Sequence, residues 1–156
     1  MTIKYLIRQS NLIEGYDDPQ FDAQGMIAWQ YLSEVAFDQL DDHCIKKVQK
    51  ILTLKQTDLQ PDWRGYYRKI DVWVGGRKGV APEHIQRRMD IWLSTLSFTH
   101  PHTAHVEFEK IHPFVDGNGR TERLLMWWQQ SKQSFPLTKL TAAKREDYYK
   151  WFRDEH

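Results

Sequence analysis

Residues 112–123 combine the side chains and the loop flexibility that a nucleotide-phosphate site needs. Gly117 and Gly119 flank Asn118, which gives a loop without side-chain bulk whose amides can approach an anion closely. A helix is expected to begin directly after this loop, so its free N–H groups and the positive end of its dipole face the same anion. The run therefore predicts a phosphate-binding site.

Charged residues of the same run add the other parts of a phosphoryl-transfer site. Arg120 and Arg123 lie three positions apart on the expected helix and share a face, so both guanidinium groups can reach one polyphosphate. Asp116 is a carboxylate among these positive groups, and we expect it to hold Mg²⁺ against the phosphate oxygens. Pro113 disfavours helical geometry at His112, which places this histidine at the end of the preceding helix. An imidazole can remove a proton from a hydroxyl near neutral pH, so His112 is the expected general base.

The elements that must position these residues are mostly helical. Apolar spacing and capping residues predict helices over residues 21–37, 40–54, 81–96, 103–112, 118–132 and from 144 to the end. Residues 67–74 instead alternate and are rich in β-branched and aromatic side chains, and Gly75 and Gly76 then supply a turn. A lone hairpin has little stability of its own, so it must pack on the helices or pair with another strand. The expected fold class is mainly α, with one short β-hairpin.

Bulk composition narrows the classes of function. The 156 residues suit one domain, residues 1–156, and the net charge of +1 lacks the basic surplus of a nucleic-acid binder. No apolar run approaches bilayer length and no signal peptide is recognisable, so we expect a cytoplasmic protein without membrane contact. The single cysteine, Cys44, excludes a disulfide within the chain and is expected on an exposed helix edge. Four aromatic residues are expected at the surface, where they could join two copies as a homo-oligomer: Trp127, Trp128, Tyr148 and Trp151.

The run from His112 to Arg123 also matches in full the Fic-family signature His-x-Phe-x-(Asp/Glu)-Gly-Asn-Gly-Arg-x-x-Arg, with Phe114 expected to point inward. The chain thus resembles Fic proteins, which share a helical bundle with a β-hairpin flap. Most of them transfer AMP from ATP to a hydroxyl of a target protein. The resemblance implies ATP as substrate, Mg²⁺ as cofactor, and a Ser, Thr or Tyr hydroxyl of a protein, or of the chain itself, as acceptor.

The same resemblance implies a role for each residue of the motif. His112 would deprotonate the target hydroxyl, and Asp116 would bind Mg²⁺. The α-phosphate would lie on Asn118 and the glycine amides, the inner phosphates on Arg120, and the γ-phosphate on Arg123.

The hairpin, residues 67–79, is similar in position to the family's flap, which aligns a target segment by main-chain pairing. The expected docking edge comprises Lys69, Ile70, Asp71, Val72, Trp73, Val74 and Gly75.

A second short pattern near the N-terminus resembles the family's inhibitory helix, Ser/Thr-x-x-x-Glu-Gly/Asn. It lies within residues 8–15 and runs from Ser10 through Glu14 to Gly15. In such a helix the glutamate pairs with the second arginine of the motif, here Arg123. An arginine committed to a carboxylate cannot also bind phosphate, so we expect an intramolecular brake.

Alternatives remain open at this stage. The same site could remove AMP, with Glu14 positioning a water, or could use another donor such as UTP or CDP-choline. Phosphorylating relatives typically have lysine at the position of Gly119, which argues against that branch. Outside enzymes, the chain could be a nucleotide-binding scaffold or a metal-binding interaction module that uses four nearby histidines: His100, His102, His105 and His112.

Overall fold

The computed structural model describes residues 1–153, which form seven α-helices and one small hairpin within that range. The helices are α1 (Ile3–Ile13), α2 (Pro19–Ser33), α3 (Asp42–Thr53), α4 (Ile85–Thr95), α5 (Pro101–Ile111), α6 (Asn118–Lys132) and α7 (Arg145–Tyr149). Short 3-10 turns are η1 (Phe37–Gln39), η2 (Pro61–Trp63), η3 (Pro82–His84), η4 (Leu96–Phe98), η5 (Ala142–Lys144) and η6 (Lys150–Phe152). The expected fold class, mainly α with a short hairpin, is confirmed.

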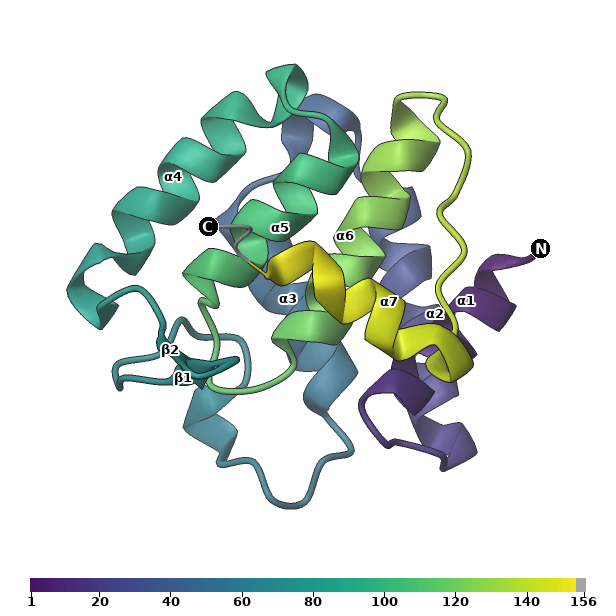
Figure 1. Cartoon of the computed structure of the whole chain (residues 1–156), viewed down its shortest axis with the longest axis horizontal. Helices are drawn as coiled ribbons and strands as arrows, with labels where there is room; N and C mark the ends of the chain where they lie inside the picture. The colour runs from purple at the N-terminus through teal and green to yellow at the C-terminus, as the bar shows by residue number, and fades with distance from the viewer. Residues whose placement is uncertain (154–156) are drawn as a thin grey trace.

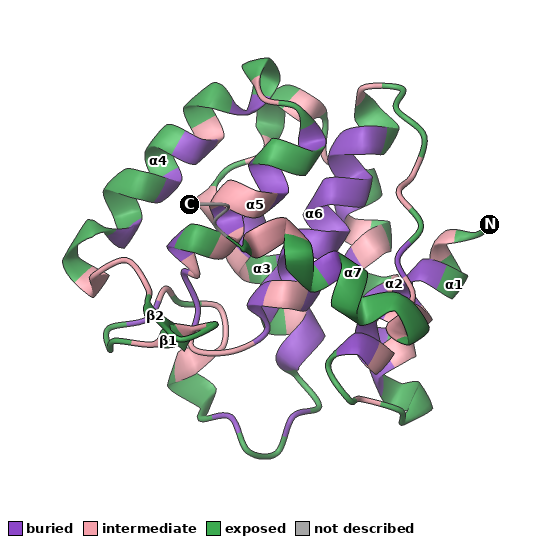
Figure 2. Cartoon of the chain, in the orientation of Figure 1, coloured by how far each residue is buried: buried purple, intermediate pink, exposed green. Residues whose placement is uncertain are grey.

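Helix α6 is the centre of the bundle, with contacts to α1, α2, α3 and α5 (Figure 1). Twelve of its 15 residues are buried, and Figure 2 shows it as the most continuously buried helix in view. A helix that is buried on every side needs partners for its polar groups as well as its apolar ones. The motif arginines therefore begin a core helix, not a surface helix.

The burial of α6 overturns the expectation of an exposed aromatic interface. Trp127 and Trp128 are both buried, and their indole N–H groups donate to the carbonyls of Thr138 (2.9 Å) and Val35 (3.3 Å). Tyr148 is buried as well, and Trp151 is half-buried. Each of these side chains already has partners within the chain, so they do not form an exposed patch for a second copy.

Cys44 was expected on an exposed edge, and that expectation is also wrong. Its thiol is buried and faces the carbonyl of Gln39, with a sulfur–oxygen distance of 3.8 Å. Its polar neighbours suggested exposure, but they belong to the N-terminal turn of α3. Asp41 is the N-cap of this helix and accepts the backbone N–H of Cys44 (2.9 Å).

The hairpin is shorter than the alternating pattern predicted. Its strands are β1 (Trp73–Val74) and β2 (Arg77–Lys78), paired antiparallel with Trp73 opposite Lys78. Residues 67–72 do not pair as a strand because Arg68 is drawn inward. Its backbone N–H donates to Pro113 (2.8 Å), which ties the base of the hairpin to the motif loop. Figure 1 shows the hairpin beside that loop.

No helix within residues 1–153 has the length and apolar character needed to cross a bilayer.

Candidate active site

The motif loop is shaped by two left-handed residues and one asparagine. His112 ends α5 with φ 49°, and Gly117 precedes α6 with φ 79°. The side chain of Asn118, the first residue of α6, accepts the N–H of Phe114 (2.9 Å) and donates to its carbonyl (2.8 Å). Phe114 is fully buried, as expected. These contacts fix the turn between α5 and α6 and use the side chain of Asn118, so its backbone is the part that stays available to a ligand.

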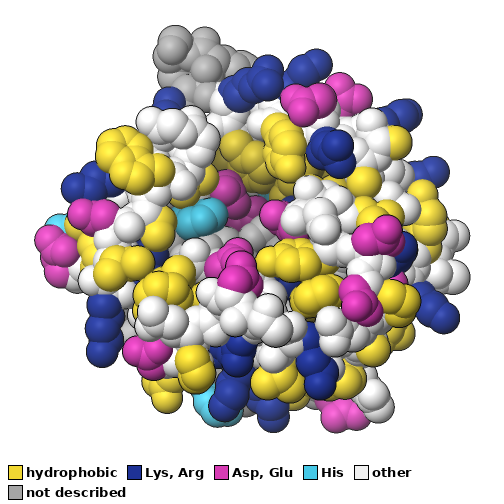
Figure 3. All heavy atoms as spheres, turned by 90° about the horizontal axis from the view of Figure 1, so that it is seen from below, with side chains coloured by type: hydrophobic (Ala, Val, Ile, Leu, Met, Phe, Trp, Pro, Cys, Tyr) yellow, Lys and Arg dark blue, Asp and Glu magenta, His cyan; other side chains and the backbone are white. Residues whose placement is uncertain are grey.

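A cavity of about 230 Å³ opens at the N-terminus of α6. On the face seen in Figure 3 the surface is hollowed, with a histidine and acidic side chains at the rim. The cavity is lined by Glu14, Glu109, His112, Asp116, Gly117, Asn118, Gly119, Arg120, Glu122, Arg123, Tyr148, Tyr149 and Phe152. All six of the motif residues expected to bind nucleotide or metal thus border one space, and His112 borders it too.

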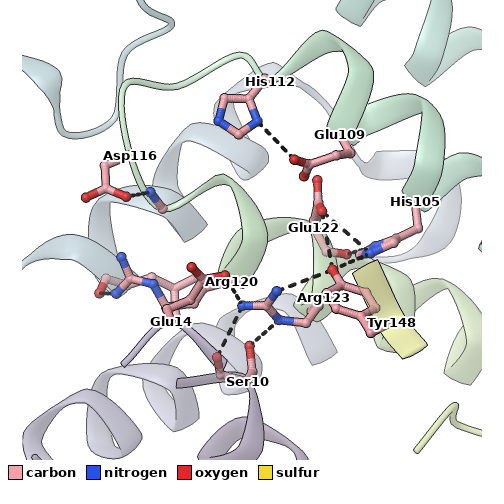
Figure 4. Close-up of polar contacts among 12 residues, drawn as sticks. Ser10, Glu14, His105, Glu109, His112, Asp116, Arg120, Glu122, Arg123 and Tyr148 are labelled. Atoms are coloured by element: carbon pink, nitrogen blue, oxygen red, sulfur yellow. Dashed lines mark hydrogen bonds and ion pairs between the residues drawn. The ribbon is translucent and has the colours of Figure 1, made fainter. Parts of the chain in front are cut away.

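Arg123 lies beneath this cavity and meets both residues of the expected brake. Its Nε donates to Ser10 Oγ (2.7 Å), and its Nη2 donates to Glu14 Oε1 (2.7 Å) and to the Ser10 carbonyl (3.2 Å) (Figure 4). Its Nη1 donates to the hydroxyl of Tyr148 at 3.3 Å. Burial opposes the charge of Arg123, but Tyr148 and Glu14 raise its pKa overall. The guanidinium of Arg123 therefore donates four hydrogen bonds to other groups of the protein.

Gly119 is what lets Glu14 approach. A Cβ at this position would lie 2.4 Å from Glu14 Oε1 and 2.9 Å from Arg123 Nη1. A side chain here would require the Glu14 carboxylate or the Arg123 guanidinium to shift, so glycine leaves room for the pair in its present geometry.

Arg120 is held differently, through a residue that sequence reasoning missed. Gln56 accepts from Arg120 Nη2 and donates to Asp116 Oδ2 (2.9 Å), so one amide bridges the cation and the carboxylate. Arg120 also donates to the Leu52 carbonyl (3.2 Å), and the Tyr16 ring covers its guanidinium at 4.4 Å. Gln56 and Tyr16 are far from the motif in sequence, and no local pattern marks them.

Asp116 fits an oxygen-preferring cation. Its Oδ1 accepts the backbone N–H of Gly117 (2.7 Å), and its carboxylate borders the cavity. The hydrogen bonds from Gly117 and from Gln56 together fix the orientation of this carboxylate, and ligands of Mg²⁺ need such a fixed orientation.

His112 has a carboxylate beside it that sequence reasoning also missed. Its Nδ1 lies 3.4 Å from Glu109 Oε1, on the last turn of α5. The signal was available, because residues three apart on a helix share a face. The other histidines of the proposed metal module do not converge on it: His100 packs on Phe135 and His102 on Trp151. Within residues 1–153, no group of three His, Cys, Asp or Glu side chains is placed to hold a metal.

The hairpin presents its residues to solvent. Trp73 is 71% exposed, and Lys69, Ile70, Asp71 and Gly75 are exposed as well. Val72 and Val74 are half-buried. Among the described residues β1 pairs only with β2, so its other edge has no strand beside it.

Comparison with known proteins places this site in a family context. The model of the Fic/DOC family matches residues 31–130. The chain is 30% identical over 118 residues to the protein adenylyltransferase Fic of Drosophila erecta, which covers 70% of this chain and 24% of that protein. It is 35% identical over 96 residues to the protein of the same name from Nematostella vectensis, covering 56% of this chain and 22% of the other.

Two solved structures share the fold. A Fic domain containing signaling protein from Bacteroides thetaiotaomicron superposes with a TM-score of 0.76 at 18% identity, covering 95% of this chain and 70% of that one. Fic-1 from C. elegans superposes with a TM-score of 0.73 at 20% identity, covering 95% and 53%. The chain spans about a quarter of the length of the curated relatives it matches.

Proposed function

This chain belongs to the Fic/DOC family, and we propose on that basis that it is a protein adenylyltransferase. The reaction transfers AMP from ATP to a Ser, Thr or Tyr hydroxyl of a target protein, or of the chain itself. A bond forms between the hydroxyl oxygen and the α-phosphorus, the bond from that phosphorus to the β-phosphate bridge breaks, and pyrophosphate leaves.

The observation that carries this proposal is the single cavity at the N-terminus of α6. His112, Asp116, Arg120 and Arg123 all border it, together with the backbone of residues 117–119. Phosphate suits this end of a helix because free N–H groups and two guanidinium groups point at one volume. The α-phosphate would lie on the amides of residues 117–119, the inner phosphates on Arg120 and the γ-phosphate on Arg123.

Proton transfer falls to His112. Its imidazole borders the cavity and would take the proton of the target hydroxyl as the new bond forms. Asp116 would hold Mg²⁺, which when bound neutralises charge on the phosphate oxygens. The open edge of β1 would align the target segment by main-chain pairing, over residues 69–75.

The same geometry supports a resting state. Glu14 and Ser10 occupy donors of Arg123 that the γ-phosphate would need. ATP could still bind, with its α-phosphate displaced from the line of attack, and small displacements there are costly. We therefore propose that α1 is an intramolecular brake. A cytoplasmic location, expected from the sequence, stays a prediction.

The test is transfer of label from α-³²P-ATP and, separately, from γ-³²P-ATP to a cell lysate and to the chain itself. Glu14→Gly should raise α-label transfer strongly, and His112→Ala in that background should lower it by about 10²–10⁴-fold. If label is transferred only from γ-³²P-ATP, the enzyme phosphorylates its target and does not transfer AMP. Equal or lower transfer by Glu14→Gly would overturn the brake.

Removal of AMP is a second candidate, because Glu14 borders the same cavity as His112. Incubation of the wild-type chain with a protein already carrying labelled AMP tests it. If the wild type releases AMP and Glu14→Gly does not, the wild type removes AMP and the variant adds it.

A further inference from the structure

We propose that Glu109 is a positioning residue for the imidazole of His112, and that Glu122 holds Glu109 in place through a carboxyl pair. This inference deepens the proposed function and rests on His112 being its general base. Glu109 precedes the motif, and Glu122 occupies one of its unspecified positions.

Glu109, on the last turn of α5, faces the imidazole of His112. The two side chains are 15% and 20% exposed, and Glu109 Oε1 lies 3.4 Å from His112 Nδ1. That ring nitrogen is buried, and among the described residues it has no hydrogen-bond partner of good geometry, so the Glu109 carboxylate at 3.4 Å is the polar group in place to accept from it. The backbone of His112 is fixed as well, because its N–H donates to the Phe108 carbonyl at 2.9 Å. A buried nitrogen with one carboxylate beside it has a single way to satisfy its N–H.

Glu122 approaches Glu109 from α6. Its side chain is 1% exposed. Oε1 lies 3.5 Å from both the Tyr148 hydroxyl and His105 Nε2, and the other oxygen points toward Glu109 (Figure 4). Two buried carboxyl groups that face each other cannot both be ionised. Among the described residues Glu122 Oε2 is buried and has no hydrogen-bond partner, so a proton held on one of the two carboxyl groups would supply the missing donor between them.

The surroundings decide which one keeps the proton. Burial raises the pKa of Glu122 well above its usual value, and the charge of Glu109 raises it further, against the opposing effect of Arg123. Burial also works against ionisation of Glu109, but hydrogen bonds from His112 and Glu122 hold its pKa below the usual value. Glu122 is therefore the protonated partner and Glu109 the carboxylate. Two other titratable groups lie beside Glu122, and burial keeps both neutral near pH 7: it lowers the pKa of His105 to about 3 and raises the pKa of Tyr148 well above its usual value.

The chemical consequence concerns the tautomer of His112. With its Nδ1–H directed at the Glu109 carboxylate, the imidazole keeps the lone pair on Nε2 free to accept the proton of a target hydroxyl. After that transfer the imidazolium lies beside a carboxylate, which stabilises the charge that develops as the bond to phosphorus forms. A carboxylate behind a histidine has this role in serine hydrolases.

The first experiment needs no enzymatic activity. In ¹⁵N-histidine spectra, with His112→Ala used for assignment, neutral His112 should carry its proton on Nδ1 in the wild type. Glu109→Leu removes the acceptor, and the Nδ1–H form should fall to the minor tautomer. Glu107→Gln is the matched control, because this glutamate of the same helix has a side chain that is 45% exposed, and it should leave the spectrum unchanged. The same tautomer in Glu109→Leu and in the wild type would overturn the proposal.

The second experiment reads the protonated partner directly. The wild type at pH 7 should show an infrared carbonyl band of a protonated, buried carboxyl group that is lost in Glu122→Gln. An unchanged band would place the proton elsewhere and overturn the carboxyl pair. This measurement also reports on Glu122 if Glu109→Leu fails to fold.

Kinetics in the Glu14→Gly background complete the test. Glu109→Gln keeps an acceptor for Nδ1–H but not its charge, and should lower kcat about 10-fold with little change in KM for ATP. Glu109→Leu should lower kcat about 100-fold, within the range of a general base that has lost its support. Wild-type kcat in Glu109→Leu would overturn the positioning role. Absence of transfer from Glu14→Gly itself would overturn the proposed function, while the spectra still decide the state of His112.

Discussion

Arg120 and Arg123 lie three residues apart on one buried helix, yet their charges are satisfied in different ways. Arg123 has an anion, Glu14, at 2.7 Å. Arg120 has neutral acceptors on Gln56 and Leu52, and its Nε is buried without a partner among the described residues. Burial lowers the pKa of Arg120, although nearby Asp116 raises it. A buried cation with neutral partners favours an incoming anion, so under the proposed function Arg120 would be the arginine prepared for phosphate and Arg123 the one withheld.

Acid should destabilise the protein through His105. This imidazole is fully buried, with Nε2 at 2.8 Å from the Tyr148 hydroxyl and Nδ1 at 3.2 Å from the Glu122 carbonyl. Burial, helped by the charge of Arg123, lowers its pKa to about 3. As the pH falls below the ordinary value of about 6.5, the unfolded chain takes a proton that the folded chain refuses until about pH 3. Stability is therefore lost over this window, by up to about 1.4 kcal/mol per pH unit.

The measurement is urea unfolding at pH 7 and pH 5. The wild type should lose about 2 kcal/mol more than His105→Gln between these two values. His84→Gln, an exposed histidine, should behave as the wild type does. Glu122 acts in the opposite direction, because its raised pKa makes the folded chain lose stability as the pH rises, but it is present in all three proteins. The same pH dependence in His105→Gln and the wild type would contradict this account.

At the scale of elements, one side chain joins the hairpin to the motif loop. Arg68 is buried, and its guanidinium donates to four carbonyls: Val80 (2.6 Å), His112 (2.7 Å), Ile70 (2.9 Å) and Ile111 (3.2 Å). These acceptors come from both sides of the hairpin and from the end of α5. Arg68 therefore couples the position of the hairpin to the left-handed turn at His112, which a non-glycine residue adopts only when its surroundings hold it there.

Arg68→Lys tests this coupling. An ammonium keeps the charge but cannot serve four carbonyls in the planar fork of a guanidinium. We expect the free energy of unfolding to fall by about 2–4 kcal/mol, because buried carbonyls lose donors. Amide exchange at Gly79, whose N–H donates to Val72 (2.9 Å), should accelerate beyond the global loss. Lys69→Gln, at the exposed neighbouring position, should change neither quantity, and an equally stable Arg68→Lys would contradict the role of the fork.

The bounds of some elements could be predicted from the sequence and those of others could not, and each difference has a physical reason. Helix α6 was predicted over 118–132 and occupies those residues, because the glycine before it marks where it begins. Helix α5 was predicted to begin at residue 103 but begins at Pro101, with the His100 side chain as its N-cap. Helix α1 was read as a short turn within residues 8–15 but begins at Ile3, because its apolar face shows only against the rest of the bundle. The hairpin was overestimated because alternation alone does not reveal that Arg68 is captured by the loop.

At the scale of the whole molecule, segments from both ends of the described chain meet at one guanidinium. Ser10 and Glu14 reach Arg123 from α1, and Tyr148 reaches it from α7. The two segments also touch each other, since the N–H of Ala142 donates to Gln9 Oε1 at 2.9 Å. The motif could be predicted because its residues are contiguous. Gln56, Tyr16 and Tyr148 could not, because only the fold brings them to it.

Under the proposed function α1 and nucleotide would compete for Arg123, and stability measurements should reveal the competition. Without ligand, Glu14→Gln should unfold at lower temperature than the wild type. Its loss is about 1 kcal/mol, because Glu14 is 37% exposed and its pair with Arg123 is partly screened. When Mg²⁺ and ATP are added, Glu14→Gln should gain more stability than the wild type gains. A ligand at 100 times its Kd adds about 2.7 kcal/mol, and Glu14→Gln should reach that ratio at a lower ATP concentration than the wild type.

Coupling of this kind is reciprocal. The free energy of ATP binding that is gained when Glu14 loses its charge equals the stabilisation by the Glu14 charge that is lost when ATP is bound. Thermal unfolding across an ATP titration, with and without Mg²⁺, measures both sides of that balance. Glu14→Gln separates the charge from the backbone change that Glu14→Gly adds at the C-cap of α1, and Glu107→Gln controls for loss of a glutamate elsewhere. If ATP stabilises Glu14→Gln and the wild type equally at every concentration, Arg123 is not shared between the two. The contact between Glu14 and Arg123 would then only hold α1 to the bundle.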